Sequence, residues 1–173
     1  MGQVFKFGQW PIPAGEVFLT TKLSLGIVNY KPIVPGHVLV LPRRVVPRFS
    51  ELTSDEVKDM FLTAQKVGAV VEKEYKGEAL MITLQDGAMA GQTVPHVHVH
   101  IITRVKGDWT NNDEIYPEID KKEREMNAEL SKGEKDKKGV DNDERKPRTL
   151  EEMTVEATGL RPHFEQFEDV WSA

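Results

Sequence analysis

The sequence predicts one domain of mixed α and β structure, in which antiparallel strands come before and after a long helix along the chain. Three observations predict it: short β-rich runs bounded by Pro and Gly, a central stretch with apolar residues at helical spacing, and a strictly alternating run near residue 100. The 173 residues suffice for one hydrophobic core and are too few for two comfortable ones. We therefore expect residues 1–173 to form a single domain.

The first part of the chain predicts antiparallel strands joined by tight turns. The β-rich runs are residues 4–8, 17–21, 23–29 and 37–41. Pro and Gly separate them, and both residues interrupt a strand and favour turns. Residues 79–84 form a later apolar strand, and a glycine-rich turn at residues 85–92 leads from it to the alternating run at 96–102.

Two helices are predicted, each with a recognisable start. In the first, Thr53 and Glu56 form a capping box, and Lys76-Gly77 stops the helix. In the second, Thr149 and Glu152 form another capping box. The apolar residues expected to pack recur every three or four positions: Val57, Met60, Phe61, Ala64, Val67, Val71 and Tyr75 in the first helix, and Met153, Ala157, Leu160 and Phe164 in the second.

A charged insert separates the alternating run from the last helix. About two-thirds of residues 118–148 are charged, with acids and bases nearly balanced and few large apolar side chains. Burial there cannot offset the entropy cost of ordering the chain. We therefore expect a flexible, solvated loop over residues 118–148.

Composition excludes several functions. The chain has no Cys, so disulfides, thiolate nucleophiles and Cys-type zinc sites are absent. A formal charge of -5 gives no overall basic field for DNA or RNA, although a small phosphorylated ligand needs only a local site. The sequence has no apolar stretch long enough to predict a membrane span or a secretory signal. We expect an untargeted soluble protein in the cytoplasm, with the nucleus also compatible.

The run His96-Val97-His98-Val99-His100-Ile101-Ile102 carries the functional signal. In a strand, alternate side chains share a face, so His96, His98 and His100 point one way while the aliphatic residues point the other. Three same-face histidines against an apolar counter-face make a structural accident improbable.

Two kinds of chemistry fit these histidines. Imidazoles at positions i and i+2 of a strand can both reach a zinc ion, but catalytic zinc needs a further ligand, and only His37 and Asp86 stand out elsewhere. Alternatively, a neutral imidazole attacks phosphorus near neutral pH when an acceptor holds Nδ1–H and frees Nε2. Gln85, Gln92 and Thr93 precede the run and can face a phosphate.

The run matches the signature of the histidine triad (HIT) family at every position. The flanking segments at residues 29–40 and 85–94 resemble the fragile histidine triad branch, whose members hydrolyse dinucleoside polyphosphates such as diadenosine triphosphate to AMP and ADP. The long insert and Ala88-Met89, where the family usually has Pro and an acidic residue, depart from the pattern. The resemblance implies an α+β fold with a five-stranded antiparallel sheet and two helices per subunit, with the sheet extended across a homodimer.

The resemblance also implies roles for individual residues. His98 would be the nucleophile that becomes transiently nucleotidylated, oriented by the backbone carbonyl of His96, with His100 on the phosphate and His37 in support. Gln85, Gln92 and Thr93 would line the phosphate path and Asn29 would bind ribose. The adenine slot would be walled by Phe7, Ile12 and Leu25 with its neighbours up to Val28. No tightly bound cofactor is implied, although Mg²⁺ or Mn²⁺ can accompany the substrate.

Two alternatives share these residues. One is an adenosine phosphoramidate hydrolase or nucleotidyl transferase of the same superfamily; Gln92, where phosphoramidate-cleaving members carry a small hydroxyl residue, favours the dinucleotide branch. The other is a signalling protein that binds a dinucleotide and turns it over slowly. The sequence does not specify the polyphosphate length, the second nucleoside or the cellular partner.

Overall fold

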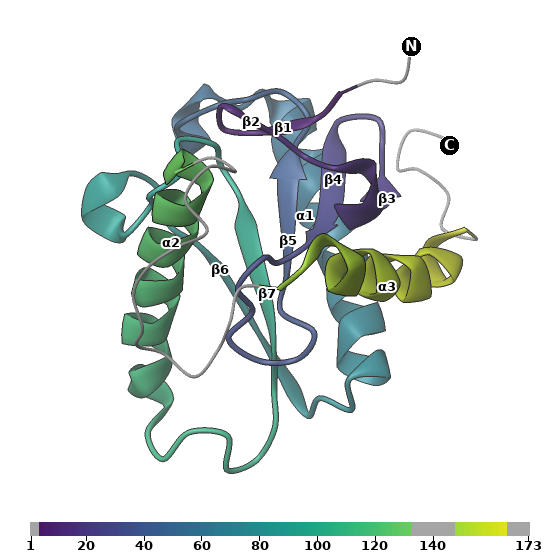
Figure 1. The fold of residues 1–173 in the computed structure, drawn as a ribbon, viewed down its shortest axis with the longest axis vertical. Coiled ribbons are helices and arrows are strands. Elements are labelled where there is room, and N and C mark those ends of the chain that lie inside the picture. The colour runs from purple at the N-terminus through teal and green to yellow at the C-terminus, as the bar shows by residue number, and fades with distance from the viewer. Residues whose placement is uncertain (1–3, 133–147, 166–173) are drawn as a thin grey trace.

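The computed structural model describes residues 4–132 and 148–165 (Figure 1). A five-stranded antiparallel sheet forms its centre, as the resemblance implied, and its strand order is β3-β4-β5-β7-β6. Its strands are β3 (Val17–Thr20), β4 (Ser24–Val28), β5 (Val38–Pro42), β6 (Ala79–Leu84) and β7 (Val99–Arg104). A separate two-stranded ribbon pairs β1 (Lys6–Phe7) with β2 (Trp10–Pro11).

One face of the sheet is covered by two helices. They are α1 (Ser54–Glu74) and α3 (Leu150–Leu160), and each begins with the capping box that the sequence predicts, at Thr53 and Thr149. Alternating residues of the strands pack against both helices in one core cluster. The strand side of the cluster includes Val38, Val40, Val97, Val99 and Ile101. The helix side includes Met60 and Val67 of α1 and Met153 and Ala157 of α3. The helix periodicity and the strand alternation therefore bury the same core from two sides.

The histidines occupy the opposite face. Leu25 and Ile27 of β4 and Leu39 and Leu41 of β5 pack there against Phe7 and Ile12 of the N-terminal ribbon. A third helix, α2 (Ile115–Lys132), covers the rest of this face and runs along β6 and β7 in Figure 1. Both faces of the sheet are thus shielded.

Helix α2 corrects the expectation of a flexible loop over its first half. Residues 118–132 are helical, whereas residues 133–147 lie outside the described part of the chain. Four apolar side chains with helical spacing explain the helix, because they place one stripe against the sheet face: Ile115, Ile119, Met126 and Leu130. The high charge of the segment reflects the solvated sides of this helix. The family resemblance implies two helices and therefore did not predict this third one.

The alternating run also differs from the prediction at its start. Strand β7 begins at Val99, so His96 and His98 precede the strand ladder. The backbone there is held by the Val97 amide, which donates to the carbonyl of Val46 at 2.7 Å. Val97 still joins the core with Val99 and Ile101, so the predicted alternation of faces holds.

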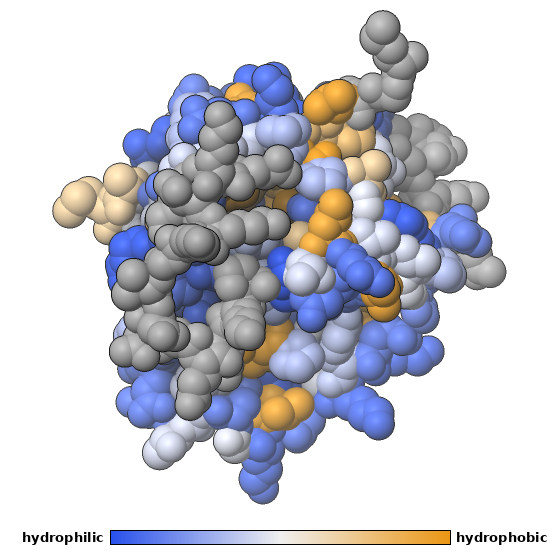
Figure 2. Space-filling view, viewed as in Figure 1, coloured by the Kyte–Doolittle hydropathy of each residue, from blue (hydrophilic) through white to orange (hydrophobic). Residues whose placement is uncertain are grey.

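The surface seen in Figure 2 is mainly hydrophilic, with apolar residues in small separate patches. The short helix η3 (Ala88–Ala90) protrudes on the left of Figures 1 and 2, and Met89 at its tip is fully exposed. Within the described residues, no helix has both the length and the apolar character needed to cross a membrane.

Candidate active site

His98 is held in one orientation by the chain next to it. Its Nδ1 lies 2.7 Å from the carbonyl oxygen of His96, so Nδ1 carries the proton and donates to that oxygen. The ring of Phe7 meets the ring of His98 edge-on, with centroids 5.0 Å apart. The backbone therefore directs the Nε2 of His98 away from the main chain and toward α2, which is the orientation a nucleophilic imidazole requires.

Both ring nitrogens of His96 make hydrogen bonds to backbone groups, which gives this side chain a structural role. Its Nδ1 accepts from the Gly8 amide at 3.2 Å, and its Nε2 donates to the Pro42 carbonyl at 2.9 Å. Burial lowers the pKa of His96 to about 4, which keeps the ring neutral. Its side chain ties the N-terminal ribbon to the end of β5, while its carbonyl aims His98.

His37 and His100 form a buried relay. The Ile33 amide donates to Nδ1 of His37 at 3.1 Å, so the proton of neutral His37 resides on Nε2. That Nε2 lies 3.0 Å from Nδ1 of His100 and donates to it, which leaves the proton of His100 on its own Nε2. Burial and the neighbouring His98 lower the pKa of His100 to about 4. His100 therefore presents an N–H donor, suited to an oxyanion.

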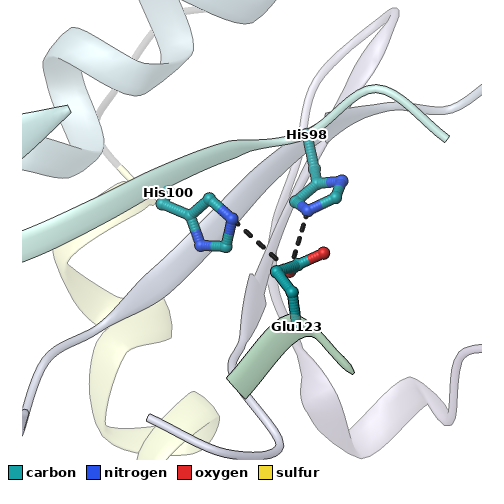
Figure 3. A group of neighbouring side chains, drawn as sticks. All are labelled: His98, His100 and Glu123. Carbon is teal, nitrogen blue, oxygen red and sulfur yellow. Dashed lines mark hydrogen bonds and ion pairs between the residues drawn. The ribbon is translucent and has the colours of Figure 1, made fainter. Parts of the chain in front are cut away.

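Helix α2 brings a carboxylate to these two donors. Oε1 of Glu123 lies 3.0 Å from Nε2 of His98 and 3.4 Å from Nε2 of His100, and Figure 3 shows both rings turned toward it. All three side chains are buried. The Nε2 of His100 has no hydrogen-bond partner among the described residues, because its contact to Glu123 is long.

The ion pair between His98 and Glu123 sets their charges. Burial alone would lower the pKa of His98, but the charge and hydrogen bond of Glu123 and the His96 carbonyl raise it above its ordinary value. Burial opposes the charge of Glu123 as well, yet His98 brings the pKa of that carboxyl down to about 2. With α2 in place, His98 is therefore more readily protonated than a free imidazole, and Glu123 is ionised.

The same three side chains form a cluster of metal-ligand type within the described residues, since their ligand atoms lie within 4.8 Å of one another. A metal needs the lone pair of each imidazole nitrogen. The relay from Ile33 through His37 places a proton on Nε2 of His100, the atom that faces the cluster. This arrangement favours an anion over a cation between His98 and His100.

The predicted adenine slot is an apolar cluster in the structure. Phe7, Ile12 and Leu25 are buried together, and Ile27 joins them. Met126 of α2 belongs to the same cluster. These side chains therefore form one buried apolar cluster to which α2 contributes, and the adenine slot stays a prediction.

The predicted polar contacts divide into two groups. Gln85 donates to Oδ1 of Asp120 at 2.6 Å, and the Thr93 hydroxyl lies 3.2 Å from Oε2 of Glu123, so both face α2 beside the histidines. Gln92 is instead engaged with backbone, accepting from Gly87 and donating to Pro47. In this arrangement Gln92 holds the glycine-rich turn in place.

Asn29 lies behind the relay. Its side-chain oxygen accepts from the Lys31 amide at 2.9 Å, and its nitrogen lies 3.2 Å from Nε2 of His37. It is 4% exposed. The structure thus groups Asn29 with His37 and His100.

Sequence reasoning missed three residues at this site. Asp120, Glu123 and Met126 all come from the charged insert and recur at intervals of three along one face of α2. The spacing of Ile115, Ile119, Met126 and Leu130 was the available signal, and the surrounding charge concealed it.

The fold and the site together define a class of α+β protein. In this class a histidine at the face of an antiparallel sheet is oriented by a hydrogen bond to its own backbone, and its free ring nitrogen faces a position suited to an anion. This chain belongs to the HIT domain family, as predicted, because the family model matches residues 13–107, more than half of its length. A curated relative named bis(5'-adenosyl)-triphosphatase, from Dictyostelium discoideum, is 46% identical over 92% of this chain and 93% of its own.

A second curated relative and a solved structure are also similar to this chain. The asymmetrical bis(5'-nucleosyl)-tetraphosphatase of Schizosaccharomyces pombe is 44% identical over 92% of this chain and 94% of its own length. The crystal structure of Plasmodium falciparum diadenosine triphosphate hydrolase in complex with Cyclomarin A matches with a TM-score of 0.60 and 32% identity, covering 75% of this chain and 88% of that one. The likeness therefore extends to the predicted fold.

Proposed function

We propose that this protein hydrolyses dinucleoside polyphosphates, with diadenosine triphosphate cleaved to AMP and ADP through a nucleotidyl-histidine on His98. One observation supports it above all: the 2.7 Å contact between Nδ1 of His98 and the His96 carbonyl, which leaves Nε2 as the reacting atom. The names of the curated relatives support the same activity.

The reaction would take two displacements. Nε2 of His98 attacks the α-phosphorus, the bond from that phosphorus to the bridging oxygen breaks, and ADP leaves with the electron pair. The ring then holds phosphorus on Nε2 and hydrogen on Nδ1, and the His96 carbonyl stabilises its positive charge. Water next attacks the same phosphorus, the P–N bond breaks with its electron pair returning to Nε2, and AMP leaves while a proton from the water passes to solvent. The N–H of His100 would donate to a non-bridging oxygen in both steps.

Mass spectrometry of protein quenched during turnover of diadenosine triphosphate tests this proposal. We expect an adenylate adduct on the peptide of residues 95–104. Oxygen-18 tracing should show overall retention at the α-phosphorus, because two displacements restore its configuration. Inversion would indicate one direct attack by water and would refute the covalent mechanism.

The polyphosphate length stays open between triphosphate and tetraphosphate, as the two relatives' names differ on it. Parallel kcat/KM measurements on diadenosine triphosphate, diadenosine tetraphosphate and an adenosine phosphoramidate will rank these substrates. Preference for the phosphoramidate would favour the alternative within the superfamily.

We further propose that catalysis needs no protein-held metal, and that Mg²⁺ or Mn²⁺ enters with the substrate. The proton on the Nε2 of His100 supports this, since it opposes a cation beside His98. Protein treated with chelator and dialysed should regain full activity with Mg²⁺ alone. Activity that returned only with Zn²⁺ would support a metal hydrolase.

The homodimer is also a proposal. Strand β6 lies at one edge of the sheet, and Ile82 on it and Phe61 on α1 are each more than 40% exposed. An apolar strand edge of this kind can pair with a second copy. Light scattering should give twice the chain mass, and Ile82→Lys should reduce it.

Cytoplasmic and nuclear locations can be compared by imaging a fluorescent fusion.

A further inference from the structure

Helix α2 fills the site from which the chemistry would proceed. Asp120 contacts Gln85, Glu123 contacts His98 and His100, and Met126 enters the cluster of Phe7 and Leu25. The three α2 residues span six positions, about 9 Å along a helix axis. A single helix face thus reaches the phosphate path, the nucleophile and the base slot.

The chemistry of each contact matches one part of a nucleotide. Glu123 places an anion between two imidazole nitrogens, where a phosphate would accept from the N–H of His100 and lie against Nε2 of His98. Asp120 places a second acidic oxygen on the amide of Gln85 at 2.6 Å. Met126 buries an apolar side chain in a slot that also suits a planar base. An acidic group and an apolar group therefore occupy the positions expected for phosphate and base.

The docked helix also blocks the reaction itself. Its contact holds a proton between Nε2 of His98 and the Glu123 carboxylate, so the lone pair needed for attack is occupied. His98 is 2% exposed and His100 is 1% exposed. Neither a nucleotide nor water reaches the reacting nitrogen in this arrangement.

We propose that α2 is an internal inhibitor that mimics the nucleotide and must leave the site before substrate binds, an inference that rests on the function proposed above. The helix suits two states. Four apolar side chains hold it against the sheet face, and its many charged side chains keep it soluble when it is displaced. The nucleotide would in turn replace the contacts of Asp120, Glu123 and Met126, which supplies the differential affinity that any such shift requires.

Binding of AMP to matched variants tests the proposal by calorimetry. Apparent affinity falls in proportion to the fraction of molecules with an open site. Glu123→Gln removes the charge and keeps the shape, so we expect AMP to bind about tenfold more tightly or better. Met126→Ala should shift affinity in the same direction. Glu118→Gln removes the same charge from another face of α2 and should bind AMP as the unaltered protein does.

Hydrogen exchange on the unaltered protein tests it without any substitution. Saturating AMP should speed amide exchange across residues 115–132 while it slows exchange around residues 96–100. Slower exchange in both segments would mean that α2 closes over a bound nucleotide, which overturns the inhibitor. Unchanged AMP affinity in Glu123→Gln would overturn it too.

These outcomes are separable from failure of the proposed function. If the adenylate adduct forms on residues 95–104 but AMP leaves α2 protected, the hydrolase stands and the inhibitor falls. If Glu123→Gln and Met126→Ala tighten AMP binding but no adduct forms, the inhibitor stands and the covalent mechanism falls.

Discussion

Nε2 of His98 lies 3.0 Å from Oε1 of Glu123, and both side chains are 2% exposed. The two residues are 25 positions apart and belong to segments of opposite character, the aliphatic run that leads into β7 and a charged helix. Their contact joins the nucleophile proposed for the reaction to the residue proposed to inhibit it.

Replacement of the nucleophile should separate chemistry from binding. His98→Asn deletes the atom that would bond to phosphorus and little of the binding surface. We expect turnover of diadenosine triphosphate to fall by several orders of magnitude, while AMP binds at least as tightly as it does to the unaltered protein, because the contact to Glu123 is lost as well. Steady-state kinetics and calorimetry on the same preparation check this, and near-normal turnover would remove His98 from the mechanism.

Replacement of the donor should cost less. His100→Asn removes an N–H to the phosphate but no bond-forming atom, so we expect kcat to fall by about 10² to 10³. The adenylate adduct should still form slowly. If this variant loses as much activity as His98→Asn, the two roles have been assigned wrongly.

The ion pair predicts a pH dependence of stability. The folded pKa of His98 lies above its ordinary 6.5, so its contribution is full below 6.5 and fades as pH rises through the raised value. The folded pKa of Glu123, about 2, lies below 4.5, so its contribution is full above 4.5 and fades as pH falls toward 2. Docking of α2 is therefore strongest between 4.5 and 6.5.

The comparison of two proteins at two pH values measures this effect. The neighbouring His96 and His100, with pKa values of about 4, stay neutral above pH 6, so His98 dominates the change. The difference in unfolding free energy between the unaltered protein and Glu123→Gln should be larger at about pH 6 than at about pH 9. A difference that grows with pH would show that His98 is neutral in the docked state.

Gly8 should be sensitive because it meets two demands. Its φ is +60°, and a Cβ there would lie 2.9 Å from Cγ1 of Val94. Its amide also donates to Nδ1 of His96. We expect Gly8→Ala to lower the free energy of unfolding by about 1–3 kcal/mol in urea titration.

Gly159 provides the control for that substitution. It lies in α3, and a Cβ there would meet no atom within 4 Å among the described residues outside the helix's own neighbouring backbone. Gly159→Ala should raise the free energy of unfolding by about 1 kcal/mol, because Ala favours a helix more than Gly does. Equal effects of the two substitutions would contradict the strained role of Gly8.

The sequence by itself determined most of the strands, two of the three α-helices and the common face of the histidines. Strand alternation placed three imidazoles opposite Val97, Val99 and Ile101, and two capping boxes located the starts of α1 and α3. These features are local, because they depend on spacing along one strand or one helical turn. Even the aim of His98 follows from a neighbour two residues away.

Only the tertiary structure decided what faces the histidines. The relay from Ile33 to His100 and the contact from Glu123 to His98 join residues far apart in the chain. A helix as charged as α2 has little apolar surface of its own, so docking against Ile102 and the apolar slot supplies much of the stability that its composition lacks. Composition averages over all sides of a segment, and burial depends on one stripe, which is why the sequence showed a loop where the fold places a helix.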